Sequence, residues 1–216
     1  MARLLPITAL TAALTLTTLS APGCGPATSG SARVRQDPMA ASWVPPVAVS
    51  HPPFRQETFH ANWLDTRGTT YVYMDVLGDY RRTGSYIRLL LNEVNQQGLR
   101  VAPNSSPFCL FYDDPGSGRP VEDLRARVGI ELEQVQPVKA PLGVDALPPQ
   151  TVAHACVSGP YPGSSRAYPA LFSYMSSMNW ARSGPIQEIY HIAPTAEVDP
   201  VDLVCEILIP VQRADR

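Results

Sequence analysis

An internal repeat between residues 58 and 212 limits the folds open to this chain more than any other feature. Each copy begins with a segment rich in β-branched and aromatic residues, at 69–76 and at 151–157, which predicts a strand. Three further features recur in the same order in both copies: Gly78-x-Tyr80 and Gly159-x-Tyr161, an early helical tyrosine at Tyr86 and at Tyr168, and Pro-x4-Tyr at Pro107–Tyr112 and at Pro185–Tyr190.

The spacing of apolar residues predicts the remaining elements of each copy. A helix is predicted after Ser85, where apolar residues recur at helical intervals until Gly98, and a second helix after Ser164 or Ser165. Two strands follow each helix, at 107–112 and 128–135 in the first copy and at 185–190 and 203–211 in the second. The sequence therefore predicts an α+β fold: duplicated β-α-β-β units that form a curved antiparallel sheet around a pseudo-twofold axis, with helices on the outside. Repeat one covers about 58–136, repeat two covers about 147–212, and the segment 137–149 links them.

One carboxylate interrupts the similarity of the two copies. Side chains alternate along a strand, so Ile186, Glu188 and Tyr190 share one face. We expect Phe108, Leu110 and Tyr112 on the matching face of the first copy, with Leu110 as the counterpart of Glu188. An exposed glutamate on a half-buried strand is the simplest interpretation of the residue, because such residues are common.

Several stretches of the chain together carry a resemblance to a known family. They are 107–115, Leu147-Pro148-Pro149 before a strand, Gly159-Pro160-Tyr161, 184–190 and the terminal 206–211. In their order and spacing these stretches resemble the GyrI-like small-molecule-binding domain, the effector-binding module of AraC- and MerR-type multidrug regulators. The resemblance covers roughly residues 58–212. It implies a cup whose apolar, aromatic-lined cleft holds one acidic residue, which falls on Glu188.

The resemblance makes ligand binding the leading hypothesis. The implied partner is a small lipophilic, aromatic or cationic molecule, attracted by aromatic rings and by a carboxylate in a dry cup, and no cofactor is expected. A hydrolase of electrophilic small molecules is the alternative, with Glu188 as base and Tyr190 or Tyr161 as hydrogen-bond donor. Haem binding, as in the similar SOUL-type proteins, is a third, with His154 and His191 as axial ligands. The expected ligand-binding residues are Glu188, Tyr190, Tyr112, Phe108, Tyr71, Tyr73, Tyr80, Tyr161 and Trp180.

The first 57 residues have the pattern of an export segment. Residues 1–23 combine a basic start, an uncharged run and small residues before Cys24, as in a secretory signal. Ala21-Pro22-Gly23-Cys24 resembles a lipobox, which implies a lipid-anchored protein of the cell envelope; a cleaved signal with an unmodified Cys24 is the alternative. The proline-rich stretch 24–57 predicts a tether and has no helix-turn-helix pattern.

Charge and cysteine content narrow the choice of partners. The 17 Lys and Arg residues nearly balance the 19 Asp and Glu residues and form no basic run, which argues against nucleic acid as a partner. If Cys24 is lipidated, the odd number formed by Cys109, Cys156 and Cys205 requires at least one free or intermolecular thiol. Buried, inert cysteines are the simplest interpretation, and their spacing fits no zinc motif.

Overall fold

The computed structural model describes residues 59–193 and 198–214. The predicted signal (1–23), Cys24 and the predicted tether (24–57) lie outside the described residues, so export and lipidation stay predictions. Within the described part of the chain, no helix has both the length and the apolar character needed to cross a bilayer.

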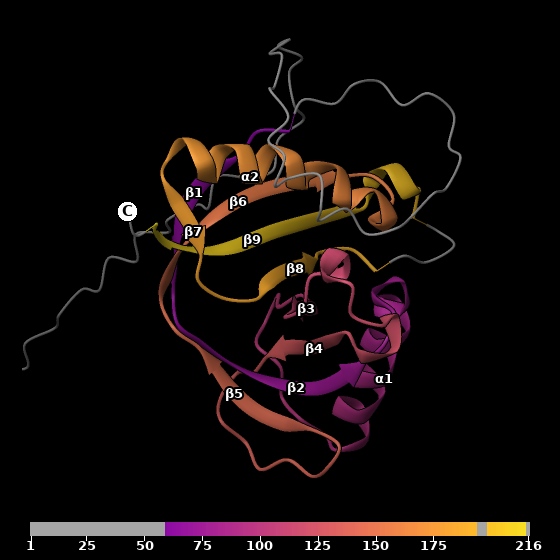
Figure 1. Cartoon of the computed structure of the whole chain (residues 1–216). Coiled ribbons are helices and arrows are strands. Elements are labelled where there is room, and N and C mark those ends of the chain that lie inside the picture. The colour runs from indigo at the N-terminus through magenta and orange to yellow at the C-terminus, as the bar shows by residue number, and fades with distance from the viewer. Residues whose placement is uncertain (1–58, 194–197, 215–216) are drawn as a thin grey trace, which may run out of the picture.

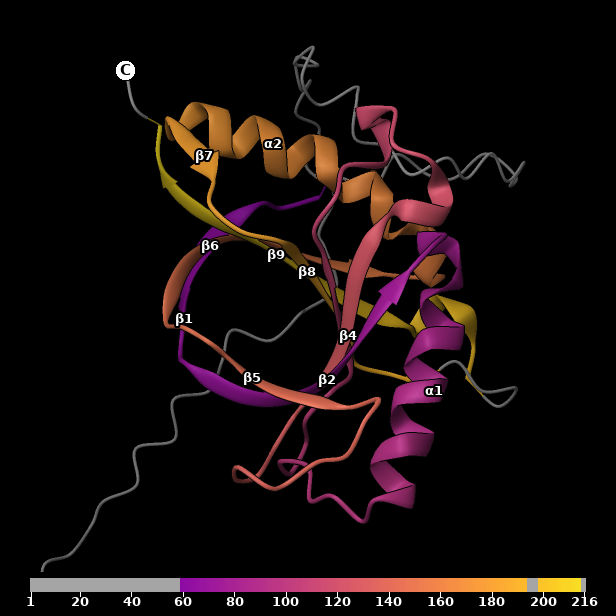
Figure 2. The same ribbon diagram turned by 60° about the horizontal axis from the view of Figure 1, so that its bottom comes forward.

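The duplicated β-α-β-β architecture is confirmed. One antiparallel sheet curls into a half-barrel, and two helices lie against its outer face (Figures 1 and 2). The first unit comprises β2 (Thr69–Leu77), α1 (Thr83–Gln96), β3 (Phe108–Phe111) and β4 (Arg125–Glu131). The second unit comprises β6 (Gln150–Ser158), α2 (Tyr168–Ser177), β8 (Ile186–Tyr190) and β9 (Val204–Arg213).

Three strands of the structure were not predicted. They are β1 (Asn62–Thr66), β5 (Gly143–Leu147) and the short β7 (Trp180–Arg182), which pairs with β9. The segment 137–149 is therefore a link that contains a strand. Each leading strand pairs with the opposite unit, β1 with β6 and β5 with β2, so each β-α-β-β unit is preceded by one strand that the sequence did not predict.

Chain connectivity explains why the sheet curls. The strand order is β1-β6-β9-β8-β3-β4-β2-β5, so β1 lies at one edge and β2 lies next to the other. Only Arg67 and Gly68 separate β1 from β2, and only Pro148 and Pro149 separate β5 from β6. These two short links hold the two ends of the sheet close together, which bends the sheet into the open ring visible in Figure 2. We call the junction formed by the two links the seam.

The two faces of the sheet are buried differently. On the outer face, α1 packs Leu90 and Val94, and α2 packs Leu171 and Met175, into the main hydrophobic core. The concave face carries a smaller buried cluster of Tyr71, Phe108 and Leu110. The central strands are therefore buried on both sides, and a side chain's face decides which environment it enters.

Gly129 allows the concave cluster to pack against β4. A Cβ atom at this position would lie 2.8 Å from Phe108 Cζ and 2.9 Å from Tyr71 Cδ2, and both rings are almost completely buried. We expect Gly129→Ala to lower the free energy of unfolding by about 1–3 kcal/mol, because buried rings have little room to shift. Gly84→Ala in α1 is the matched control, since its added methyl group meets nothing within 4 Å. Urea denaturation should show the control unchanged or stabilised by up to about 1 kcal/mol; equal effects of both substitutions would contradict the packing argument.

Candidate functional site

Glu188 lies on the outer, helix-bearing face of the sheet. Across the central strand pair it faces Cys109, whereas Leu110 faces Gln187 on the concave side. The expectation that Leu110 is the counterpart of Glu188 is therefore wrong, as is the expectation that Phe108 and Tyr112 lie on the matching face. The Pro-x4-Tyr match aligns the second strands one residue out of register, and a one-residue shift moves every side chain to the opposite face.

The Gly-x-Tyr match has the correct register and identifies the true counterpart. The Tyr80 hydroxyl accepts a hydrogen bond from the backbone N–H of Asp113 at 3.2 Å, and the Tyr161 hydroxyl accepts one from the N–H of Ile192 at 3.1 Å. Asp113 and Ile192 are thus equivalent positions. Counting back four residues from each gives Cys109 and Glu188, so a thiol occupies in the first unit the place that the carboxylate occupies in the second.

The hydroxyls of these two tyrosines hydrogen-bond to the backbone of neighbouring segments. Besides accepting from Asp113, the Tyr80 hydroxyl donates to the carbonyl oxygen of Arg125 at 2.7 Å, and the Tyr161 hydroxyl donates to the carbonyl oxygen of Ile192. Each follows a glycine in the left-handed region, Gly78 or Gly159, which makes the tight turn before it. Their hydroxyls therefore have a structural role, although both residues were expected in the ligand site.

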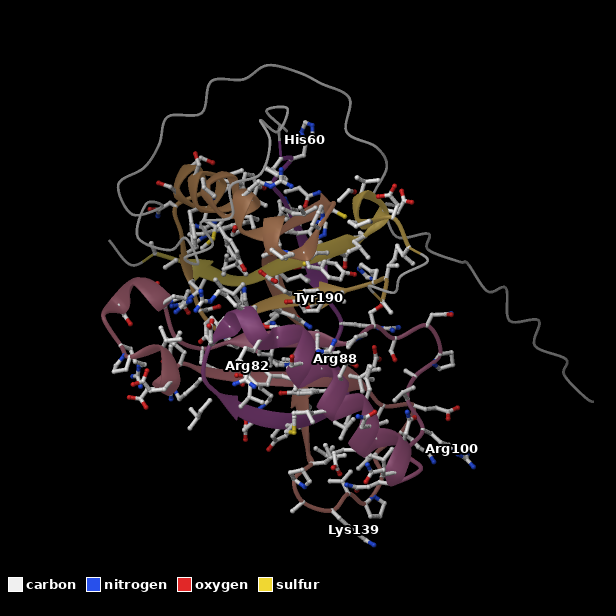
Figure 3. All side chains as sticks on the ribbon, turned by 90° about the vertical axis from the view of Figure 1, so that its right-hand side faces the viewer. His60, Arg82, Arg88, Arg100, Lys139 and Tyr190 are labelled. Carbon is white, nitrogen blue, oxygen red and sulfur yellow. The ribbon has the colours of Figure 1, made fainter. Side chains whose placement is uncertain are left out.

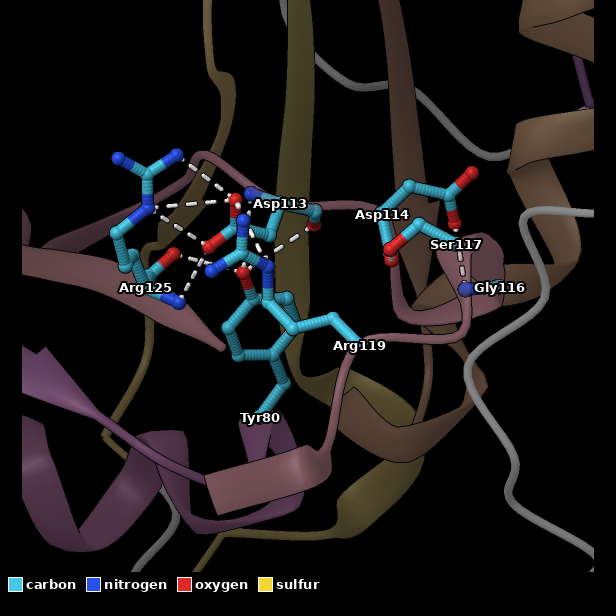
Figure 4. Close-up of polar contacts among 7 residues, drawn as sticks. All are labelled: Tyr80, Asp113, Asp114, Gly116, Ser117, Arg119 and Arg125. Carbon is cyan, nitrogen blue, oxygen red and sulfur yellow. Dashed lines mark hydrogen bonds and ion pairs between the residues drawn. The ribbon is translucent and has the colours of Figure 1, made fainter. Parts of the chain in front are cut away.

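Asp113 anchors the corner around Tyr80 (Figure 4). Its buried carboxylate accepts hydrogen bonds from the Arg125 guanidinium at 2.8 and 3.0 Å and from the Arg125 backbone N–H at 2.7 Å. Arg119 lies 3.7 Å away. The hydrogen bonds from Arg125 lower the pKa of Asp113 to about 2. The charge of this carboxylate is thus satisfied within the protein and is not open to a ligand.

The carboxylate of Glu188 has a different environment. Tyr168 Oη donates to Glu188 Oε1 at 2.5 Å, Tyr190 Oη donates to Oε2 at 2.8 Å, and Ser164 Oγ lies 3.4 Å from both oxygens. The residue is only 6% exposed. Tyr168 and Ser164 come from α2 and from the 3-10 helix Tyr161–Ala167 that precedes it. In Figure 3, the labelled Tyr190 lies at the level where the two units meet.

Three hydroxyls thus surround a buried acid that has no cationic partner among residues 59–193 and 198–214. Burial raises the pKa of Glu188, and the hydrogen bonds from Tyr168, Tyr190 and Ser164 offset part of that rise. Burial and the nearby Glu188 also raise the pKa values of Tyr168 and Tyr190 well above 10.0. Both phenols therefore stay protonated and act as donors to the carboxylate.

The structure divides the predicted aromatic residues between the two faces. Tyr161 lies edge-on to Tyr190, with ring centroids 5.0 Å apart, and this pair is on the same side as Glu188. Trp180 packs edge-on against Tyr174 beside α2. Tyr80 packs against Phe111 in the main core, with ring centroids 4.6 Å apart. The other four lie on the concave face, on the other side of the sheet from the acid: Tyr71, Tyr73, Phe108 and Tyr112.

Arg127 organises that second aromatic group. Its guanidinium carbon lies 3.6 Å from the centroid of the Tyr73 ring, and its nitrogens donate to Tyr71 Oη, Asp75 and Asp145 at 3.1, 2.9 and 2.7 Å. Arg127 therefore already supplies a cation to the Tyr73 ring and, at 6.0 Å, to the Tyr112 ring.

Sequence reasoning left Tyr168 and Ser164 out of the site. Tyr168 is the early helical tyrosine that repeats Tyr86, and Ser164 was considered only as a helix cap. Their positions before and at the start of α2 bring them over β8, and only the tertiary packing of α2 reveals this. The sequence does contain one signal for this residue, because a tyrosine recurs near the start of both helices, at Tyr86 and Tyr168.

The two predicted haem ligands belong to a network on the concave face. Glu206 lies 3.2 Å from His191 Nε2 and 3.6 Å from His154 Nε2, and these histidines lower its pKa to about 2. The other ring nitrogens contact side chains as well, His154 Nδ1 with Asn62 at 2.8 Å and His191 Nδ1 with Ser106 at 3.2 Å. Both imidazoles are thus held in side-chain contacts around one carboxylate.

The three described cysteines are in two chemical states. Cys109 and Cys205 are free and buried, which fits the expectation of inert thiols, whereas Cys156 is disulfide-bonded. Burial is the main reason that the pKa values of Cys109 and Cys205 lie well above 9.0.

Comparisons with solved structures agree with the fold. The C-terminal domain of EcmrR has a TM-score of 0.65 and 16% identity, and the match covers 73% of this chain and all of that domain. EcmrR in a complex with DNA gives a TM-score of 0.64 at 16% identity, covering 72% of this chain and 58% of that one. This chain thus matches little more than half of the EcmrR chain. A hydrolase from Listeria innocua is more distant, with a TM-score of 0.47, 12% identity and coverage of 70% and 91%.

Sequence comparisons identify a family for this chain but no individual curated relative. No curated protein sequence matches the chain significantly. The profile of the family described as GyrI-like small molecule binding domain matches residues 64–212, which is most of the chain and nearly all of the described fold. The resemblance drawn from the sequence is thereby confirmed, and the chain belongs to the GyrI-like family of small-molecule-binding domains.

Proposed function

We propose that this protein binds lipophilic cations at Glu188, between the two helices on the outer face of the sheet. One observation carries the proposal: a buried carboxylate accepts three hydroxyl contacts and has no ion-pair partner within the described residues. An unpaired buried charge costs several kcal/mol, and a bound cation offsets that cost. A neutral ligand brings no charge to offset that cost.

The surroundings of Glu188 favour a ligand with apolar, flat surfaces. Tyr161 and Tyr190 present an edge-to-face pair on one side, and Tyr168 stacks on Phe172 with ring centroids 6.2 Å apart. Aromatic faces attract cations by about 0.5–2 kcal/mol, in addition to the gain from burying apolar area. Because Glu188 is 6% exposed, the ligand reaches it only when the residues that cover it, Ser164 and Tyr168 among them, move aside.

Binding is tested by thermal shift of the purified protein with crystal violet, a lipophilic cation, and with leucocrystal violet, its neutral reduced form. A ligand at 100 times its Kd stabilises the native state by about 2.7 kcal/mol, which raises Tm by several degrees. We expect this rise with the cationic dye and little with the neutral one. Equal shifts would contradict the role of the carboxylate, and no shift across a panel of such cations would contradict the proposal.

Hydrolysis is a second candidate, and the pair formed by Glu188 and Tyr190 favours it. A carboxyl with a raised pKa suits a general base near neutral pH, and the Tyr190 hydroxyl 2.8 Å away is a proton donor. Product formation from electrophilic small molecules, followed by mass spectrometry, separates the candidates. Turnover that Glu188→Gln abolishes while binding persists would indicate an enzyme; binding without turnover would indicate a receptor.

The setting of this activity is proposed chiefly from the sequence. Residues 1–23 have the pattern of an export signal, so we place the binding domain in the cell envelope, where a disulfide such as that of Cys156 persists. Fractionation of cells that produce the protein or a variant that lacks residues 2–23 checks this, because only the former should leave the cytoplasm.

A further inference from the structure

A serine, a histidine and a glutamate contact one another in sequence on the concave face, on the opposite side of the sheet from Glu188. Ser106 Oγ lies 3.2 Å from His191 Nδ1, and His191 Nε2 lies 3.2 Å from Glu206 Oε2. A hydroxyl, an imidazole and a carboxylate in this order are the parts of a nucleophile, its general base and the group that orients the base. Both distances are within the reach of about 2.6–3.2 Å that such pairs require.

Three neighbouring strands bring these side chains together. The pairing of β3 with β8 ends at Phe108 and Ile189, and two residues further on, Ser106 and His191 come opposite each other. A backbone hydrogen bond of 3.0 Å one residue beyond the last pair continues the ladder toward them. On the other side of β8, β9 places Glu206 directly opposite Ile189. Because side chains two residues apart share a face, all three groups lie on the concave side.

The contacts leave one imidazole nitrogen able to accept a proton. Glu206, whose pKa is lowered to about 2, is charged at neutral pH and accepts the hydrogen bond from His191 Nε2. Nδ1 of the neutral ring therefore presents its lone pair to the Ser106 hydroxyl. The hydrogen bond to Glu206 also raises the pKa of His191 above 6.5, which makes the ring a stronger base. His154 Nε2, 3.6 Å from the second oxygen of Glu206, helps to hold the carboxylate in place.

A cavity of about 320 Å³ opens beside this trio at the seam. Ser106 and His191 both line it, next to the apolar side chains of Phe108, Ile189 and Leu208. The volume is at the small end of the range for ligand pockets and suits a short apolar group. The His191 side chain is 36% exposed, so water can reach the trio.

The backbone of the serine offers a donor for the negative charge that develops when a hydroxyl attacks a carbonyl group. The N–H of Ser106 makes no hydrogen bond to any residue in 59–193 or 198–214. In serine proteases, the N–H of the nucleophilic serine itself is one of the donors to the oxygen of the tetrahedral intermediate. The group that attacks and a group that stabilises the resulting charge thus come from one residue.

We propose that Ser106, His191 and Glu206 form a catalytic site that hydrolyses carboxylic esters with short apolar acyl groups. Ser106 Oγ bonds to the acyl carbon while His191 Nδ1 takes the hydroxyl proton; the bond to the alcohol oxygen then breaks, and the alcohol leaves with that proton. Water attacks the acyl-serine and passes a proton to His191, and the acid leaves as Ser106 regains its proton. Ester and water thus become acid and alcohol, without oxidation or reduction.

Release of p-nitrophenol from p-nitrophenyl butyrate by the purified full-length protein tests the proposal. We expect Ser106→Ala and His191→Gln each to lower kcat/KM by at least about 100-fold. Ser105→Ala is the matched control, because the buried hydroxyl of that neighbouring serine makes no hydrogen bond within the described chain, and it should keep the wild-type rate. No release above the buffer blank, or equal rates from wild type and Ser106→Ala, would overturn the proposal. Equal rates on p-nitrophenyl decanoate would overturn the preference for short acyl groups.

This site is independent of the proposed cation site, because the two lie on opposite faces of the sheet. Glu188→Gln should therefore hydrolyse the butyrate ester at the wild-type rate, whatever its effect on dye binding. A loss of ester hydrolysis in Glu188→Gln equal to that in Ser106→Ala would overturn the assignment to the concave face.

Covalent labelling identifies the nucleophile directly. A fluorophosphonate bonds to the oxygen of an activated serine with loss of fluoride, and mass spectrometry of peptides should place the adduct on Ser106 in the wild-type protein. Glu206 acts through His191 as a positioning residue, so we expect Glu206→Gln to slow labelling at least about ten-fold and Glu206→Asp, which keeps the charge, to restore part of the rate. An adduct on another residue, or labelling that His191→Gln leaves unchanged, would overturn the proposal.

Discussion

Replacing Glu188 with glutamine should weaken the binding of crystal violet by about 30-fold or more, and that of leucocrystal violet by no more than about three-fold. The substitution keeps the size of the side chain, removes its charge and replaces one of its two acceptor oxygens with an NH2 donor. Truncating one member of a buried charge pair typically costs about 2 kcal/mol or more, which corresponds to this factor. Isothermal titration calorimetry with each dye gives both affinities.

The matched control is Glu133→Gln, an exposed carboxylate that leaves the net charge equal to that of Glu188→Gln. A long-range effect of net charge would weaken binding in both variants, whereas the proposed contact affects only Glu188→Gln. Tyr161→Phe provides a second comparison: its hydroxyl bonds to the backbone of Ile192 and not to the carboxylate, so the selectivity for the cationic dye should persist. Equal loss of both dyes in Glu188→Gln would show that the carboxylate shapes the site without attracting charge.

The architecture was predictable from the sequence because three kinds of local signal recur in the same order in both copies. Strand segments, helical apolar spacing and the Gly-x-Tyr turns recur in order, and the turn match proved to be in true register because Tyr80 and Tyr161 perform the same bracing role. The exchanged strands β1 and β5 were not predicted. Both are short, and each pairs with the other unit, so nothing within its own repeat marks it as a strand.

The candidate site was predictable only in part. Glu188 was identified through family resemblance; the structure buries it beside Tyr190, and its role in ligand binding stays a prediction. The prediction of one aromatic cup ignores the alternation of side chains along each strand, which places Tyr71 and Phe108 on the far side of the sheet from Glu188. A Pro-x4-Tyr match that is one residue out of register is enough to cause this error. Tyr168 could be placed only by the packing of α2 over β8.

The same Glu188→Gln substitution should stabilise the unliganded protein at neutral pH and so raise its Tm. Burial raises the pKa of Glu188 above 4.5, so the folded state holds this proton at pH values where the unfolded state has released it. Wild-type stability from this group is therefore greatest below about pH 4.5 and declines as the pH rises toward the folded-state pKa. Glutamine does not titrate and avoids this loss.

The decisive measurement is the difference in Tm between variant and wild type from pH 4 to pH 8. We expect a small difference at pH 4 that widens as the pH rises and then becomes constant. Asp113 and Glu206 have pKa values lowered to about 2, so they affect both proteins equally and cancel from the difference. Tyr168→Phe is the opposing variant, because removing a donor to Glu188 Oε1 raises the carboxyl pKa further and should lower stability most at high pH. A Glu188→Gln protein that is less stable than wild type at every pH would mean that the hydroxyl contacts more than compensate for burial of the charge, and the carboxylate would then need no cation.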